Sequence, residues 1–274
     1  MSFLPSTPGQ SSAPALLPTQ LADARAGGVS YHIAGELVPV LAVDLAPGQS
    51  VFFEHHILLW KDPALQFRVR PLAGMVKRLI AGMELLIVEA VGPGQVAFSR
   101  DGVGHVFPVV LAPGQELDVR EHQFLAATGN VDFTWQRVQG VANMLFGGTG
   151  FFIDRFQAGT EEGVVWLHGH GNVFEKTLMA GEQFDVEPGG WLYKDPSVVI
   201  ETNYQGLSAG FLGGMSLACN RFTGPGRIGL QSMSVNIETS GADQASAATT
   251  QAASTTAMGV IGAIAGGIFG GKRD

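Results

Sequence analysis

One turn-forming stretch occurs three times in this 274-residue chain, and it constrains the fold more than any other feature. The stretch reads Leu111-Ala-Pro-Gly-Gln-Glu-Leu-Asp-Val119, and related segments cover residues 45–53 and 178–186. The turn glycines of the three segments are evenly spaced: Gly48, Gly114 and Gly181. A fixed interval of this kind indicates that one structural unit has been copied along the chain.

Two further landmarks keep the same interval. Lys61-Asp62-Pro63 returns two intervals later as Lys194-Asp195-Pro196. A series of glycines ahead of apolar runs also recurs once in each interval: Gly82, Gly148 and Gly214. We therefore expect three modules of about 66 residues, each too small to bury enough surface to be very stable alone, so the modules should share interfaces.

The composition predicts short strands joined by tight turns. Hydrophobic residues make up 46% of the chain and charged residues only 15%, with 38 glycines and 14 prolines. Pro47-Gly48 and Pro113-Gly114 suit a type II turn, in which glycine takes the positive φ, and Ala180-Gly181 keeps the glycine without the proline. Short apolar runs between such turns predict strands, which we place at Gln95–Ser99, Phe124–Ala127, Val164–His168, Trp191–Lys194 and Arg227–Gln231.

These features predict an all-β fold of three short double-stranded β-helix or β-sandwich repeats around a pseudo-threefold axis. Only Val138–Leu145 and Gly206–Leu212 suggest helix, and both are short enough to be connectors. The expected domain boundaries follow from changes in composition. They are a flexible N-terminal arm at 1–28, the three-repeat domain at 29–238, a low-complexity linker at 239–256 and a Gly-rich apolar tail at 257–274.

The apolar tail allows three interpretations. Gly262, Gly266 and Gly270 have the four-residue spacing that lets apolar helices pack closely. The run at 257–271 is shorter than the ~20 residues needed to span a bilayer. The tail is therefore a loose or docked segment, an oligomerising or peripheral membrane contact, or a membrane anchor.

Charge and cysteine content limit the class of partner and the compartment. The net charge is −8, which argues against a nucleic-acid partner. Cys219 is the only cysteine, so no intrachain disulfide can form and a reducing compartment is favoured. Residues 1–20 lack the positive charge and apolar core of a signal peptide. We expect a cytoplasmic protein that forms homo-oligomers or binds a protein partner, with membrane association through its tail as a further option.

The strongest candidate for metal chemistry is His168, His170 and Glu175. Two imidazoles at i and i+2 on a strand face the same side and can share a metal ion with a carboxylate. The layout resembles the cupin motifs, which use His, His and Glu followed by a further His. The spacing differs by one residue on both sides, and Tyr193 stands where the last histidine belongs. An offset of one residue sends a side chain to the other face of a strand.

The other polar residues favour structural roles. In Glu54-His55-His56, neighbouring imidazoles on a strand would face opposite sides, which prevents chelation unless the strand bulges. Arg155 and Arg221 occupy matched positions in successive modules, and we expect them to pair with carboxylates at module junctions. Cys219 lies in an apolar run and is expected to be a small core residue.

Two segments carry a resemblance to a known family. Residues 211–232, with Arg221-Phe222 and Gly224-Pro225-Gly226, and residues 146–156, with Arg155-Phe156, resemble the altered-inheritance-of-mitochondria (mitochondrial biogenesis) family over about residues 30–235. The resemblance implies a fold like that of the tryptophan RNA-binding attenuation protein. It implies no catalytic residues or cofactor, and it suggests a scaffold-type function. A cupin-like metalloprotein and a small-molecule binding module remain as alternatives.

Overall fold

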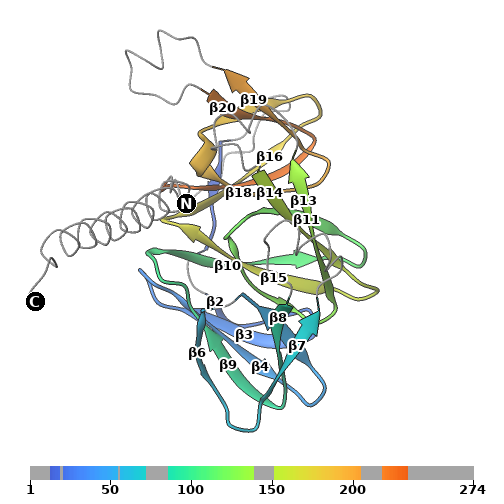
Figure 1. Ribbon diagram of the computed structural model, residues 1–274. Helices are drawn as coiled ribbons and strands as arrows, with labels where there is room; N and C mark the ends of the chain where they lie inside the picture. The colour runs from blue at the N-terminus through green and yellow to red at the C-terminus, as the bar shows by residue number, and fades with distance from the viewer. Residues whose placement is uncertain are drawn as a thin grey trace, which may run out of the picture. The chain divides into compact units, whose positions relative to one another are not determined.

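The structure, a computed structural model, describes residues 13–18, 21–54, 56–71, 86–138, 151–204 and 218–233. These residues form twenty-one strands and one turn of 3-10 helix, which lies at Pro188–Gly190. The strands make four sheets, and every described strand pair is antiparallel. The expected all-β class is therefore confirmed (Figure 1).

Two sheets contain strands β2 to β10 together with β12 and β15. The five-stranded sheet has the order β2 (Leu21–Ala26), β3 (Val29–Ala34), β4 (Val40–Leu45), β9 (Gly94–Phe98) and β6 (Leu58–Lys61). The six-stranded sheet has the order β10 (Gly104–Leu111), β15 (Gly163–His170), β12 (Phe124–Thr128), β5 (Ser50–Phe53), β8 (Leu86–Val91) and β7 (Gln66–Pro71).

The remaining two sheets contain mostly later strands. The seven-stranded sheet has the order β1 (Ala15–Leu16), β16 (Val173–Leu178), β21 (Gly226–Gln231), β18 (Trp191–Lys194), β11 (Glu116–Arg120), β14 (Phe151–Ala158) and β13 (Val131–Val138). The three-stranded sheet has the order β17 (Gln183–Val186), β20 (Ala218–Thr223) and β19 (Val199–Tyr204). Each of the five strands expected from sequence is present.

The three turn glycines join successive strands in the same way. Gly48, Gly114 and Gly181 have φ values of 84°, 74° and 76°, so the predicted need for a positive φ is confirmed. In each turn the side chain that follows the glycine accepts a hydrogen bond from the backbone N–H three residues earlier. The donor–acceptor distances are 2.7 Å for Ala46 and Gln49, 3.0 Å for Ala112 and Gln115, and 2.9 Å for Met179 and Glu182.

Strand pairing also recurs at corresponding positions. The strands β8, β14 and β20 each lie between two partners, β5 and β7, β11 and β13, and β17 and β19 respectively. The strands β9, β15 and β21 lie between β4 and β6, β10 and β12, and β16 and β18. A register shift occurs at one place in each of the second set, at Leu58/Trp60, Phe124/Ala126 and Trp191/Tyr193.

The Lys-Asp-Pro landmark closes the loop after β6 and after β18. The carboxylate of Asp62 accepts a 2.8 Å hydrogen bond from the backbone N–H of Gln95, and Asp195 accepts one of the same length from Arg227. The backbone carbonyls of the same two aspartates accept from the N–H three residues later. The motif therefore marks two corresponding turns rather than a catalytic site.

Three apolar clusters form the core. One surrounds Trp166 and Phe98, a second surrounds Phe107 and Phe156, and a third surrounds Trp191. All five of these side chains are 2% exposed or less. Cys219 is buried, as expected from its apolar surroundings.

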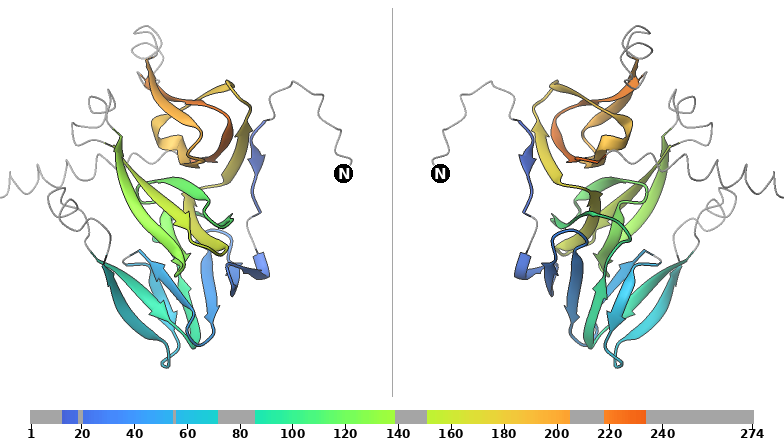
Figure 2. Two further views of the ribbon diagram at one scale, coloured as in Figure 1. Left: turned by 90° about the vertical axis from the view of Figure 1, so that its right-hand side faces the viewer. Right: turned by 90° about the vertical axis from the view of Figure 1, so that its left-hand side faces the viewer.

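The prediction of a flexible arm over residues 1–28 is wrong for its later part. Strand β1 pairs with β16, and Figure 2 shows this dark-blue strand beside a yellow one. Strand β2 pairs with β3, and Ala24 and Ala26 pack against the first apolar cluster. The sequence of this segment shows no clear alternation of apolar and polar residues. A neighbouring strand edge nevertheless satisfies its backbone groups.

Several expectations concern residues outside those described. These are Gly82, Gly148, Gly214, His55, the helix expected at 206–212, the linker and the tail with Gly262, Gly266 and Gly270. Of the helix expected at Val138–Leu145, only Val138 is described, and it ends β13. No described helix has the length and apolar character required to cross a membrane.

Candidate functional site

The two histidines singled out from sequence lie on β15, between β10 and β12. The ring centroids of His168 and His170 are 5.0 Å apart with an interplanar angle of 83°, so both imidazoles occupy the same side of the strand, as predicted. His168 is 1% exposed, and so is His105 on the paired strand β10. Gly104 permits this packing, because a Cβ at that position would collide with the His168 ring.

The environment holds these imidazoles in their neutral form. Burial, followed by coulombic coupling to His170 and the positive charge of Arg100, lowers the pKa of His168 to about 3. Burial and the charges of Arg100 and Arg120 also lower the pKa of His170. For His105, burial lowers the pKa more than its hydrogen bond to the Pro18 carbonyl raises it.

The third predicted metal ligand is engaged elsewhere. Glu175 lies on β16, in a different sheet from β15. Its carboxylate accepts a hydrogen bond from the Tyr193 hydroxyl and lies 3.7 Å from Arg227. Within the described ranges, no group of three His, Cys, Asp or Glu side chains is placed to hold a metal ion. The cupin-like combination of His168, His170 and Glu175 is therefore not assembled here, because its carboxylate belongs to another sheet.

The described residues Glu54 and His56 belong to no group of metal ligands either. His56 follows β5 in a turn with φ 60°, so the expectation that it continues a strand is wrong. Glu54 instead forms an ion pair with Arg100, which also donates a 2.9 Å hydrogen bond to the Phe124 carbonyl and another to the His122 carbonyl. Arg100 thereby fixes the turn before β12.

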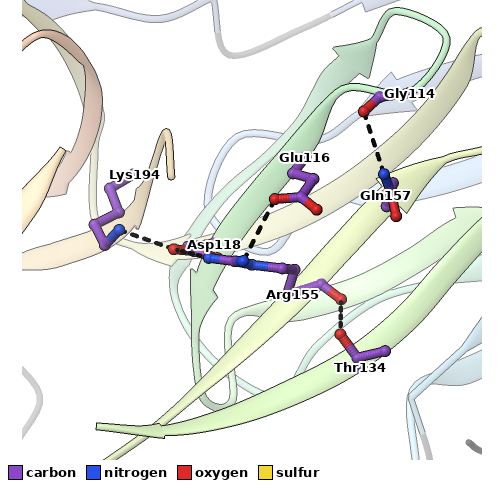
Figure 3. A network of polar contacts seen from close by, with 7 residues as sticks. All are labelled: Gly114, Glu116, Asp118, Thr134, Arg155, Gln157 and Lys194. Atoms are coloured by element: carbon purple, nitrogen blue, oxygen red, sulfur yellow. Dashed lines mark hydrogen bonds and ion pairs between the residues drawn. The ribbon is translucent and has the colours of Figure 1, made fainter. Parts of the chain in front are cut away.

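A buried charge network is centred on Asp118 of β11 (Figure 3). Arg155 of β14 donates to both carboxylate oxygens of Asp118, with distances of 2.7 and 3.0 Å. Lys194 of β18 approaches from the opposite side, with its Nζ 2.8 Å from Asp118 Oδ2. Asp118 is 2% exposed and Lys194 5% exposed, so the two charges compensate each other away from water.

The ionised form of Asp118 is favoured by its partners. Burial opposes ionisation, but the hydrogen bonds and charges of Arg155 and Lys194 outweigh it and hold the pKa of Asp118 below its usual range. Asp118 and Lys194 are direct partners in the ladder between β11 and β18. That ladder joins two groups of strands in which pairing recurs, so the network stabilises a junction.

A second carboxylate, Asp185, is held by an arginine in the same two-bond geometry but is little buried. Arg221 Nε and Nη2 each donate a 2.7 Å hydrogen bond to Asp185 of β17, and both side chains are about one-third exposed. Asn203 donates a 2.9 Å hydrogen bond to the same carboxylate. The expectation that Arg155 and Arg221 pair with carboxylates is confirmed for both. Asp118 also pairs with Lys194 across the junction between β11 and β18.

An exposed apolar stretch was missed in the sequence. It comprises the large apolar residues of β6 and β7, which are between 40% and 58% exposed: Leu58, Leu59, Trp60, Phe67 and Val69. Both strands lie at the edges of their sheets. We call this set the β6–β7 apolar patch. No signal in the sequence distinguishes this exposure, because the corresponding strand β18 also has a tryptophan beside a leucine and is buried.

These features define a class of all-β proteins in which short antiparallel strands are joined by recurring turns and by buried ion pairs. The chain belongs to the mitochondrial biogenesis AIM24 family, whose model matches residues 31–233.

The fold has a counterpart among solved structures. It is similar to the crystal structure of protein SPYM3_0169 from Streptococcus pyogenes, with a TM-score of 0.59 and 17% identity over 75% of this chain and 94% of that chain. No curated protein gives a significant sequence match. At this identity the comparison supports the fold and transfers no activity.

Proposed function

We propose that this protein is a non-enzymatic structural protein that assembles with other copies of itself. The observation that carries the proposal is the β6–β7 apolar patch, which places five large apolar side chains on two sheet edges. An apolar sheet edge is a template for pairing with another chain, and soluble proteins usually protect such edges.

The proposed architecture has three copies of one unit around a pseudo-threefold axis, with a fold like that of the tryptophan RNA-binding attenuation protein. Support comes from the matching glycine turns, the matching strand order and the three register shifts. In this arrangement each unit contributes strands to a sheet that it shares with the next unit. A protein of this kind presents one half of the shared junction at each end.

The competing functions have less support. A cupin-like metalloprotein requires His168, His170 and Glu175 around one ion, and Glu175 is bound to Tyr193 in another sheet. Nucleic-acid binding is disfavoured by the net charge of −8, whatever the fold. Membership of a mitochondrial biogenesis family is consistent with a structural role in that process. The proposal places the protein in a reducing compartment and includes a peripheral membrane contact through residues 257–271.

Light scattering of the purified full chain at micromolar concentration tests the proposal. We expect a mass larger than one chain, which decreases on dilution. Trp60→Lys should reduce that mass, whereas Val103→Lys, at an equally exposed apolar side chain in a loop, should not. A constant monomer mass over the whole concentration range would contradict self-assembly.

A further inference from the structure

The two junctions within the described chain have one form. In the first, β12 adds to β5, with Ala126 opposite Phe53 and Ala127 opposite Phe52. In the second, β18 adds to β11, with Tyr193 opposite Val119 and Lys194 opposite Asp118. The paired residues of the second junction follow those of the first by one repeat interval.

The same spacing identifies two further strands, β6 and β17, that correspond to the two sides of these junctions. Strand β6 corresponds to β12 and β18. The three strands show the same register shift against β9, β15 and β21, respectively. Strand β17 corresponds to β5 and β11, because each follows the glycine turn. Among the described strands β6 pairs with β9 alone and β17 with β20 alone.

Burial distinguishes these two edges from their counterparts. All four residues at 124–127 of β12 and all four of β18 are buried, whereas Leu58, Leu59 and Trp60 of β6 are 40%, 50% and 49% exposed. Every residue of β5 and β11 except the first of each strand is buried. The residues of β17 alternate between exposed and partly buried. Figure 1 and Figure 2 show β6 and β20, the partner of β17, at opposite ends of the described strands. The two edges therefore do not pair within one chain.

We propose that a second copy of this chain completes the junction: β6 of one copy adds antiparallel to β17 of the next, with Trp60 opposite Val186 and Lys61 opposite Asp185. The inference rests on the proposed self-assembly and names its interface. A second copy is the fitting partner because it presents both halves of the same junction. Pairing would cover the apolar side chains of β6 that are exposed in the single chain.

The charges at the two edges are complementary. Lys61 and Asp185 occupy the positions of Lys194 and Asp118, whose Nζ–Oδ2 distance is 2.8 Å. Asp185 already pairs with Arg221, as Asp118 pairs with Arg155. In the single chain Lys61 donates instead to the backbone carbonyls of Leu65 and Asp62, at 2.9 and 3.2 Å. A rotation of the lysine side chain would exchange these carbonyls for the carboxylate of the next copy.

The proposed contact joins two different surfaces of the protein. A head-to-tail contact of this type is heterologous, so it generates a closed ring if the rotation closes and a filament if it does not. Every added copy again presents one β6 edge and one β17 edge. The assembly would thus repeat between chains the junction that already joins strands within each chain.

A charge-swap experiment on the full chain tests this interface. Lys61→Glu places two carboxylates opposite each other, and Asp185→Lys places two ammonium groups opposite each other. We expect each variant alone to associate about tenfold or more weakly than the wild type. In a mixture both kinds of contact become complementary. The unchanged Lys61 of one variant faces the unchanged Asp185 of the other, and the two substituted positions face each other with their charges reversed. An equimolar mixture should therefore regain assembly, measured by native mass spectrometry as alternating copies.

Matched variants separate the possible results. Val199→Lys alters an apolar side chain about as exposed as Trp60, on β19 at the other edge of the sheet that contains β17. This variant should leave assembly unchanged. If Asp185→Lys fails to fold by circular dichroism, Asp185→Asn, which removes the charge alone, replaces it and should weaken assembly. Wild-type assembly that survives both edge substitutions would overturn this interface while leaving self-assembly standing. A monomeric wild type would overturn both.

Discussion

Asp118 and Lys194 face each other across the ladder that joins β11 to β18, and their side chains form a 2.8 Å ion pair that is almost completely buried. Removing one charge from such a pair leaves the other in a medium that solvates it poorly. We therefore expect Asp118→Asn to lower the free energy of unfolding by about 3 kcal/mol or more. Urea denaturation at pH 7, followed by tryptophan fluorescence, measures the loss.

The matched control for this prediction is Asp185→Asn. Asp185 holds Arg221 with the same two-bond geometry, but both side chains are about one-third exposed and water can solvate the arginine that remains. The loss should be much smaller, provided that both variants are measured at a concentration where the protein is monomeric. Equal losses for the two variants would show that burial of the pair is not the deciding factor.

The buried histidines predict a decrease in stability with acidification. The pKa of His168 is about 3 in the folded protein and lies near its ordinary value of 6.5 in the unfolded chain. Between these values the unfolded state binds one more proton, so stability is complete above pH 6.5 and decreases as the pH falls toward 3. One such proton corresponds to about 1.4 kcal/mol per pH unit.

Chemical denaturation between pH 7 and pH 5 measures this slope. His168→Gln should make the slope shallower, by about one proton toward pH 5, because glutamine does not titrate. The range stops above the acidic region where Asp118 and Glu89, whose pKa values are lowered by their basic partners, begin to lose charge. A variant slope identical to that of the wild type would show that His168 is already charged in the folded protein.

The glycine turns predict a requirement for an oxygen atom rather than for a particular residue. Gln115→Ala removes the acceptor of the Ala112 N–H and should cost about 1 kcal/mol or less, because water can reach this exposed turn. Gln115→Glu should be tolerated, since Glu182 makes the equivalent bond in the third turn. Thermal unfolding of the two variants distinguishes these outcomes, and equal destabilisation would refute the role of the oxygen.

Metal binding provides a direct test between the proposed function and its cupin-like alternative. We expect substoichiometric zinc, iron and manganese after purification without chelators and dialysis against each ion, because Glu175 is held by Tyr193. Elemental analysis of the wild type and of His168→Gln measures the content. One bound ion per chain that the substitution abolishes would restore the metalloprotein hypothesis.

The strands and turns were predictable because they depend on local chemistry. Glycine at positions 48, 114 and 181 is required by a positive φ, and short apolar runs between such turns are recognisable as strands before their partners are known. The arginine pairs were also predictable in kind. The carboxylates were identifiable as well, since Asp118 with Arg155 and Asp185 with Arg221 occur together at nearly equal separations.

The remaining features depend on contacts between distant segments. Nothing local to Ala15–Leu16 indicates that it pairs with β16, because the partner strand supplies the hydrogen bonds. The separation of Glu175 from the two histidines also follows from sheet order, which spacing along the chain does not determine. The exposure of Trp60 was hidden for the same reason, because the buried or exposed state of an edge strand depends on whether a neighbour is present.

The third glycine turn has one property that the other two lack. The side chain of Glu182 accepts the turn hydrogen bond through one oxygen and lies 2.9 Å from the ammonium of Lys176 through the other, and that lysine is 2% exposed. Gln49 and Gln115 make the turn bond without a buried cation beside them among the described contacts. Positions 176 and 182 should therefore change together during divergence of the family, whereas position 115 can exchange glutamine for glutamate independently.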